Sequence, residues 1–417
     1  MVGEDRNTAN GKAHETVLFQ NCQLIDGLSD EVRPAVDVLI RDGIIKEIGV
    51  GIHPATGTEG WRVIQAGGHT LLPGLIDCHT HLCLDASEGA AVARMMAEPP
   101  GTTLLRAASN ALRGLRAGVT TVRNLGSRSL GSGEPIDIVL RNAIAAGLAQ
   151  GPRILACGLA VTITGGHGYE HSREADGIDE IRKAAREQIR AGADLLKVMS
   201  SGAAMATEGR PGAQEMEQSE IEAVVEEGRR TGKHTASHAQ GDESVVASAR
   251  AGVASVEHAF LAEERGIQVL KEEGTTLVPT LVVTACALES DAITEKLRAR
   301  VQEIRPLHWA SCERAVAMGV KLATGTDAGM PDVRPGLVAR EAELLHERGL
   351  SAMEAIRAAT INGAELLGID HEVGSVSRGK LADLILVPGD PLKDLSRLQH
   401  PALVMKGGHV VVDHGLT

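Results

Sequence analysis

The sequence predicts an α/β protein, a (β/α)₈ TIM barrel with a small β-sandwich domain formed from both chain ends. Two observations predict this fold. From Leu75 onward, short apolar runs alternate with helix-length amphipathic stretches in eight units, over the roughly 300 residues that such a barrel needs. Before and after this region the chain has the pattern of short strands. The alternation alone would also fit a doubly wound open sheet.

The head of the chain is rich in strand patterns and lacks helical periodicity. Residues 1–15 are polar, and we expect them to be disordered. Residues 16–72 form the first part of the β-sandwich. A turn at Gly43 leads into one of its strands, and the strands are expected at Thr16–Gln20, Val36–Ile40, Gly43–Gly49, Val63–Gln65 and His69–Pro73.

The barrel is expected over residues 73–373. Its strands are predicted at Leu75–Asp77, Val119–Arg123, Arg153–Ala156, Leu195–Met199, Thr235–Ser237, Ser255–Glu257, Thr276–Pro279 and Lys321–Thr324. Helices between them include Asp179–Ala191, Ser219–Thr231, Asp242–Ala251 and Glu263–Glu273, with capping and turn residues at their boundaries. The longest loops are predicted at Leu84–Thr103 and Thr207–Glu217. The second is rich in Gly, Pro and charge, as a mobile flap would be.

The tail returns to strands after one more helix, predicted at Ser351–Leu367. Strands are expected at Asp383–Val387, Leu403–Lys406 and His409–Val412. Residues 374–417 therefore supply the second part of the β-sandwich.

Composition excludes several classes of partner. The formal net charge is −13 and only 1% of residues are aromatic. Nucleic acids and anionic membranes need clustered Lys and Arg, and single strands also need stacking platforms. The polar N-terminus does not resemble a signal peptide, and no run of about 18 apolar residues would span a membrane. The six cysteines show no CxxC spacing, so we expect a reduced, cytoplasmic protein.

Side chains able to bind metal follow several of the predicted strands. His79 and His81 follow the first strand, and a spacing of two puts both on one side of an extended chain. The other four are Lys197, His238, His258 and Asp327, at the ends of the fourth, fifth, sixth and eighth strands. In a barrel these ends converge on one mouth. Each residue alone is a weak signal, whereas their joint occurrence in this order is a strong one.

The sequence resembles the amidohydrolase superfamily, in the branch of imidazolonepropionase-related hydrolases, metal-dependent Xaa-Pro dipeptidases and carboxypeptidase-like enzymes. The resemblance covers nearly the whole chain from about Val17. It is carried by PGLIDCHTH (Pro73–His81), TGGHG (Thr164–Gly168), LLKVMSSG (Leu195–Gly202), SHAQG (Ser237–Gly241), SVEHA (Ser255–Ala259), TGTDAG (Thr324–Gly329) and GSVSRGKLADLILVPGDPL (Gly374–Leu392).

The resemblance implies a site for two divalent metal ions. His79, His81 and Asp327 would bind one ion, His238 and His258 the other, and Lys197 would bridge them as a carboxylated lysine. Such ligands suit Zn²⁺, and also fit Mn²⁺, Co²⁺ or Fe²⁺. A hydroxide bridging ions about 4 Å apart would attack an amide carbonyl. Asp327 would pass the hydroxide's proton to the leaving nitrogen.

Substrate contacts are expected from residues near the metal ligands. The resemblance implies that His167 contacts the substrate carbonyl or carboxylate and also serves catalysis, and Tyr169 and His171 lie nearby in sequence. Gln240 occupies a position where dipeptidase-like relatives often carry Tyr or His. Gln cannot act as an acid, so this departure leaves the substrate class open. Arg123 is a candidate for binding a substrate carboxylate, or for pairing with a barrel acid.

The sequence therefore predicts hydrolysis of a C–N amide bond in an N-acyl amino acid or dipeptide-like substrate. A cyclic or xenobiotic amide or carbamate is the alternative substrate class. A non-catalytic scaffold would be expected to have lost ligands, and a one-metal deaminase would lack Lys197. The resemblance also suggests a homo-oligomer.

Overall fold

The computed structural model describes residues 16–54, 60–87, 90–206 and 209–416. The predicted disorder of residues 1–15 lies outside this range. The strands are β1 Thr16–Leu24, β2 Arg33–Arg41, β3 Ile44–Gly49, β4 Trp61–Gln65, β5 His69–Pro73, β6 Leu75–Thr80, β7 Val119–Asn124, β8 Arg153–Ala156, β9 Val161–Thr162, β10 Arg173–Glu174, β11 Leu196–Met199, β12 Thr235–Gly241, β13 Ser255–Leu261, β14 Thr276–Val278, β15 Leu384–Pro388, β16 Leu403–Lys406 and β17 His409–Asp413.

The helices cover the middle of the chain. They are α1 Ala91–Ala97, α2 Pro100–Arg116, α3 Ile136–Ala145, α4 Gly177–Ala191, α5 Gln218–Arg230, α6 Asp242–Arg250, α7 Glu264–Glu273, α8 Leu281–Glu289, α9 Glu295–Met318, α10 Val338–Glu347, α11 Ala352–Ala358 and α12 Ile361–Leu366. Two short 3₁₀ helices lie at Tyr169–His171 and Leu395–Gln399.

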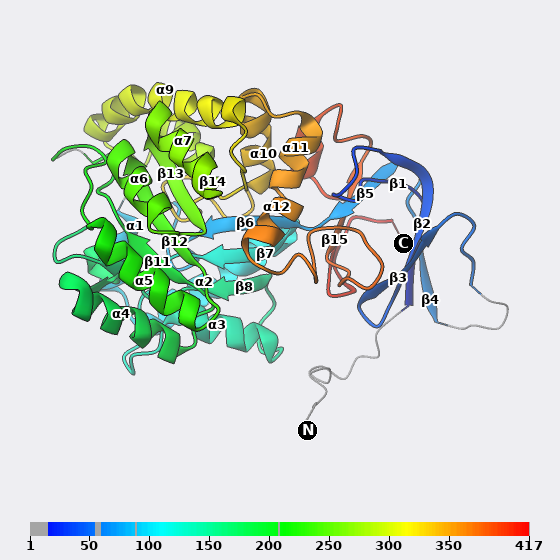
Figure 1. The fold of residues 1–417 in the computed structure, drawn as a ribbon. Helices are drawn as coiled ribbons and strands as arrows, with labels where there is room; N and C mark the ends of the chain where they lie inside the picture. Colours follow the sequence, from blue (N-terminus) through cyan, green and yellow to red (C-terminus); the bar gives the residue numbers. More distant parts are fainter. Residues whose placement is uncertain (1–15, 55–59, 88–89, 207–208, 417) are drawn as a thin grey trace.

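The two ends of the chain share one mixed sheet, as the sequence predicted. Its strand order is β17-β16-β15-β5-β1-β2-β3, and β4 pairs with β1. The tail joins the head where β15 runs antiparallel to β5, with Leu386 opposite Leu71. Both side chains are fully buried in an apolar core that belongs to this sheet. Figure 1 shows this part beside the helix-covered part of the molecule.

The middle of the chain forms two parallel sheets, ordered β6-β7-β8 and β10-β9-β11-β12-β13-β14. Residues 322–328 pass between β14 and β6, because Leu322 bridges to Leu277 and Ala328 bridges to Thr80. The Cys78 N–H also donates to the Thr324 carbonyl at 2.9 Å. The carboxyl ends of the parallel strands therefore face the same side of the fold, where the site lies.

Three expectations for this region were wrong in detail. Lys321–Thr324 is not a regular strand and makes only the single bridge at Leu322. The segment Leu84–Thr103 contains helix α1 and the start of α2. The helix expected at Ser351–Leu367 is divided between α11 and α12. It breaks there because the carbonyls of residues 358 and 359 accept hydrogen bonds from Thr324 and Ile76.

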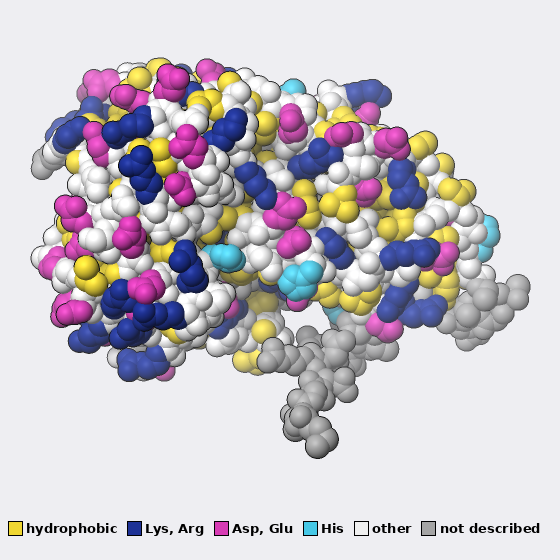
Figure 2. All heavy atoms as spheres, in the orientation of Figure 1, with side chains coloured by type: hydrophobic (Ala, Val, Ile, Leu, Met, Phe, Trp, Pro, Cys, Tyr) yellow, Lys and Arg dark blue, Asp and Glu magenta, His cyan; other side chains and the backbone are white. Residues whose placement is uncertain are grey.

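The molecular surface mixes charges of both signs. On the face drawn in Figure 2, acidic and basic side chains are interspersed among apolar and neutral ones. None of the helices in the described part of the chain has both the length and the apolar character that a bilayer-crossing segment requires.

Candidate metal centre

Three side chains converge as ligands of a single ion would. The Nε2 atoms of His79 and His81 lie 3.3 Å apart. The Oδ1 atom of Asp327 lies 3.4 Å from the first and 3.1 Å from the second. Ligand atoms bound tetrahedrally to Zn²⁺ at about 2.1 Å would stand about 3.4 Å apart. His79 is part of β6, His81 follows it directly, and Asp327 comes from the segment beside it, so the strand ends set this spacing.

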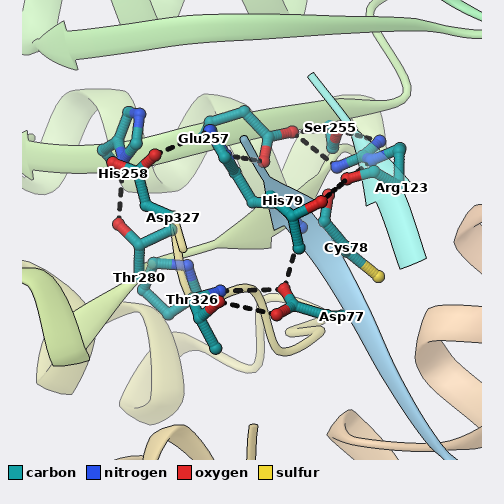
Figure 3. Close-up of polar contacts among 12 residues, drawn as sticks. Asp77, Cys78, His79, Arg123, Ser255, Glu257, His258, Thr280, Thr326 and Asp327 are labelled. Atoms are coloured by element: carbon teal, nitrogen blue, oxygen red, sulfur yellow. Dashed lines mark hydrogen bonds and ion pairs between the residues drawn. The ribbon is translucent and has the colours of Figure 1, made fainter. Parts of the chain in front are cut away.

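The orientation of His79 is fixed from behind. Its Nδ1 lies 2.9 Å from Oε2 of Glu257, and Arg123 donates to the other carboxylate oxygen at 2.8 Å. Figure 3 shows Glu257 between the two residues. A carboxylate can only accept, so Nδ1 carries the hydrogen and Nε2 keeps its lone pair toward the site. This carboxylate–histidine arrangement is typical of metal ligands.

A second buried carboxylate ties the two ligand segments together. Asp77 accepts hydrogen bonds from the backbone of His79 and of Thr326, and from the Thr326 hydroxyl. Asp327 itself has a φ of 57°, and His258 has a φ of 76°. Left-handed backbone is costly for side chains other than Gly, and it clusters at functional sites. The fold therefore holds Asp327 and His258 in strained backbone conformations.

The remaining predicted ligands surround the same space. The ring centroid of His258 lies 4.8 Å from that of His79 and 4.6 Å from that of His238. His258 Nδ1 lies 2.8 Å from the Thr280 hydroxyl. Lys197 is 1% exposed on β11, and its charge acts on the pKa of His79, His238 and His258. The parallel strands thus bring together ligands that lie far apart in the sequence.

Burial sets the protonation states of these groups. It lowers the pKa of His79 to about 4 and the pKa values of His238 and His258 well below the usual range. Burial also lowers the pKa of Lys197 to about 8. For Asp327, burial raises the pKa, but the nearby His79 and His81 outweigh it and hold the pKa below its usual value. Neutral imidazoles and a carboxylate are the forms that bind cations.

Three buried polar atoms indicate whether the site suits a metal ion. Lys197 Nζ, His238 Nε2 and Asp327 Oδ1 are buried without a hydrogen-bond partner in the described part of the chain. Asp327 Oδ1 approaches two imidazole nitrogens without forming a hydrogen bond with either. Leaving such atoms unpaired costs about 1–3 kcal/mol each, and more for charged groups. Divalent metal ions would satisfy the His and Asp atoms, and the site fits them.

The predicted substrate contacts are placed unequally. His167 stacks on His238 with ring centroids 4.3 Å apart. The backbone N–H of His167 donates to the Glu215 carboxylate at 2.8 Å. Gln240 is buried, and its side-chain Oε1 accepts a hydrogen bond from the backbone N–H of Ala204. Tyr169 is 49% exposed in the short 3₁₀ helix. His167 therefore adjoins His238, and substrate contacts from His167, Tyr169 and Gln240 stay predictions.

Arg123 lies behind the candidate ligands, paired with Glu257. It is 1% exposed, and its guanidinium donates to the Cys78 carbonyl, the Ser255 hydroxyl and the Glu257 carboxylate. These contacts occupy its guanidinium, and a contact with a substrate carboxylate stays a prediction. The structure favours the alternative use, pairing with a barrel acid, and through Glu257 this pairing orients His79.

The residues that hold the site in place, Asp77, Glu257 and Thr280, were not predicted from the sequence. Glu257 lies 178 positions from His79 in the chain, so no local pattern reveals the pair. Two signals were present in the sequence: an acid next to His258 inside an apolar strand, and an acid two positions before His79.

Comparisons with known proteins agree with this geometry. The Amidohydrolase family model matches residues 70–411. Ochratoxinase from Aspergillus niger is 29% identical over 83% of this chain and 76% of its own length. Imidazolonepropionase from Geobacillus thermodenitrificans is 26% identical over 85% and 83%. A crystal structure of a Xaa-Pro dipeptidase with bound methionine in the active site is 31% identical, covers 95% of this chain and all of its own, and has a TM-score of 0.85. The chain therefore belongs to the amidohydrolase family, and it is a metal-dependent amidohydrolase related to ochratoxinase and prolidases.

Proposed function

We propose that this amidohydrolase hydrolyses the amide bond of an N-acyl amino acid or dipeptide-like substrate with two divalent metal ions. The observation that carries the proposal is the convergence of His79, His81 and Asp327. His258, His238 and Lys197 are buried near them. We assign His79, His81 and Asp327 to one ion, His238 and His258 to the other, and a carboxylated Lys197 to the bridge between them. Zn²⁺ is the ion we favour, because imidazole and carboxylate ligands suit it.

The fold we propose for this chemistry is a (β/α)₈ barrel over residues 73–373, with a β-sandwich from residues 16–72 and 374–417. The bridges of Leu322 and Ala328 to the two parallel sheets support closure of the barrel. In a barrel the site lies at the carboxyl ends of the strands.

The reaction consumes one water and breaks one C–N bond. Bound divalent ions would polarise the carbonyl oxygen and make water acidic enough to attack at neutral pH. Asp327 accepts a proton from the attacking water and returns it to the nitrogen as the C–N bond breaks, which gives a carboxylic acid and an amine. His167, beside His238, orients the substrate through its carbonyl or carboxylate.

Two features favour a second substrate class, a cyclic or xenobiotic amide or carbamate. The guanidinium of Arg123 donates to Glu257, and the side chain of Gln240 carries no charge. The predicted contact of Arg123 with a substrate carboxylate is therefore less supported, and Gln240 cannot act as an acid. In favour of the first class, a similar dipeptidase structure holds methionine, an amino acid, in its active site.

The first experiment measures metal content and activity together. Purified protein is analysed for bound metal and then offered N-acyl amino acids, dipeptides and carboxylate-free amides. We expect two ions per chain and turnover of the carboxylate-bearing amides. Two ions with turnover of carboxylate-free or cyclic amides only would overturn the substrate class. Fewer than two ions in the active protein would contradict the binuclear site.

The role of Asp327 is tested by Asp327→Asn. The amide cannot accept the proton, so we expect kcat to fall by about 10²–10⁴-fold while KM changes much less. Metal content is measured on the same sample, because Asp327 is also a proposed ligand. A variant that holds the wild-type metal content and keeps its kcat would remove the proton-transfer role.

We also propose a cytoplasmic homo-oligomer. All six cysteines are free and five are buried, which supports a reducing compartment. The oligomer rests on the family resemblance alone and stays a prediction.

A further inference from the structure

An apolar hollow of about 410 Å³ lies beside the candidate metal centre. We call it the α1 pocket. Helix α1 supplies Val92, Ala93 and Met96, the segment after Asp327 supplies Met330 and Pro331, and Glu170 is the charged residue in its lining. The hollow is of the size that small-molecule sites occupy.

Parts of the α1 pocket are formed by residues that lie next to the candidate metal ligands. Gly329, which also lines it, stands two residues after Asp327. A β-carbon on Gly329 would lie only 2.9 Å from the carbonyl oxygen of His81, so this wall lies against the ligand segment. Helix α1 follows His81 along the chain, and Glu170 precedes His171.

The wall that contains Glu170 is also close to the site. A β-carbon on Gly126 would lie 3.1 Å from His81 Nδ1 and 3.9 Å from the ring of His171. His171 and Glu170 belong to the same short 3₁₀ helix. Segments that follow β6, β9 and the bridge at Leu322 thus line the pocket on the side of the site where His81 and Asp327 lie.

We propose that the α1 pocket receives an apolar side chain on the amine half of the substrate. This inference rests on the proposed function. Asp327 gives its proton to the leaving nitrogen, so the amine half lies on the side of Asp327. The apolar lining favours a hydrocarbon group there. Glu170 disfavours a carboxylate in the pocket, so the carboxylate of an amino-acid product points away from it.

The test is a series of N-acetyl amino acids with unbranched side chains, from glycine through alanine and norvaline to norleucine. Burying a methylene contributes about 0.8 kcal/mol, so kcat/KM should rise about fourfold with each added methylene in the wild-type metal-loaded enzyme. Ala93→Trp fills the pocket and should flatten this series.

The matched control is Ala97→Trp on the same helix. Ala97 is exposed and does not line the pocket, so this variant should keep the wild-type slope. A wild-type series without a slope, or a slope that Ala93→Trp leaves unchanged, would overturn the α1 pocket while the amidohydrolase proposal stands. If no N-acetyl amino acid is cleaved, the proposed substrate class fails instead.

A binding measurement separates the two failures. Calorimetric titration of the metal-loaded protein with free norleucine and glycine does not depend on turnover. Wild type and Ala97→Trp should bind norleucine more tightly than glycine, and Ala93→Trp should lose most of that preference. If all three proteins prefer norleucine over glycine to the same degree, the α1 pocket does not bind the apolar side chain, whatever the result of the activity screen.

Discussion

At the scale of single residues, Arg123 and Glu257 form a buried ion pair directly behind His79. Both side chains are at most 1% exposed. Burial raises the pKa of Glu257, but the charge of Arg123 and the hydrogen bond from His79 outweigh it and hold the pKa at about 2. Such a pair contributes little net stability, whereas removing one partner leaves a buried charge unpaired.

Arg123→Met should therefore lower the free energy of unfolding by about 3–5 kcal/mol. It should also weaken metal binding, because Glu257 orients His79. Chemical denaturation measures the first effect and metal analysis the second. Arg141→Met breaks a partly exposed pair with Asp194 and should cost at most about 1 kcal/mol. If Arg123→Met instead keeps its stability and raises KM for carboxylate-bearing substrates only, Arg123 is a substrate contact after all.

Lys197 poses a different problem for the fold, because a buried ammonium without a partner is costly. Carboxylation would remove that cost and create an anionic bridge. Lys197→Ala should accordingly reduce the bound metal from two ions per chain to one or fewer, and activity should fall with it. Adding a short carboxylic acid should restore part of both, since its carboxylate can occupy the space of the missing bridge.

A matched control for Lys197 is Lys406→Ala. Lys406 donates to the Gly151 carbonyl in the sheet part of the molecule, so its loss should leave metal content unchanged. Two ions and full turnover in Lys197→Ala would exclude the carbamate bridge.

At the scale of elements, the start of helix α8 depends on a buried acid from α10. Glu341 accepts hydrogen bonds from the N–H groups of Leu281 and Val282, both at 2.8 Å. His308 accompanies it, with Nε2 2.8 Å from the Pro279 carbonyl. Between these contacts lies Thr280, at a φ of 56°, whose hydroxyl meets His258. The two side chains thus hold the strained turn that orients His258.

Glu341 gives stability a pH dependence whose sign is fixed. Burial raises its pKa to about 8, so the folded protein holds this proton more tightly than the unfolded chain. Protonated Glu341 therefore makes its whole contribution to the free energy of unfolding below about pH 4.5. This contribution is lost as the pH rises through about 8. Relative to Glu341→Gln, wild type should lose at most about 1.4 kcal/mol per pH unit in this window.

Denaturant midpoints measured from pH 4.5 to 8.5 test this dependence. Glu347→Gln changes an exposed residue of the same helix and should follow the wild-type curve. Parallel curves for wild type and Glu341→Gln would show that Glu341 is ionised throughout.

Local pattern predicted the elements well where local forces decide them. The strand at Leu403–Lys406 has the predicted bounds, and the mixed sheet from both chain ends is confirmed. The helix at Ser351–Leu367 was predicted as one piece because its break depends on Ile76 and Thr324, which are distant in sequence. In the site, strand ends identified the histidines, whereas Glu257, Thr280 and Glu341 act through partners that only the folded chain reveals.

At the scale of the whole molecule, the candidate metal centre joins the first parallel strand, β6, to the segment of residues 322–328. The Asp327 N–H donates to the His79 carbonyl and the His81 N–H donates to the Ala328 carbonyl, both at 2.8 Å. One apolar core also spans both parts of the molecule: Ile25, Leu72, Ile385 and Val404 from the mixed sheet pack with Leu75 and Val119 from the parallel strands. An ion bound at this junction therefore stabilises more than its immediate surroundings.

Removing the metal with a chelator should lower the unfolding temperature of the whole chain. An ion that binds only the folded state adds about 2.7 kcal/mol when its free concentration is 100 times its Kd. Readdition of Zn²⁺ should restore the midpoint in step with its concentration. His81→Ala removes a ligand and should shrink the chelator-induced shift, whereas His69→Ala, in β5 of the mixed sheet, should keep it. An equal shift in His81→Ala and wild type would place the stabilising ion elsewhere, because an ion at this centre cannot lose a ligand without losing affinity.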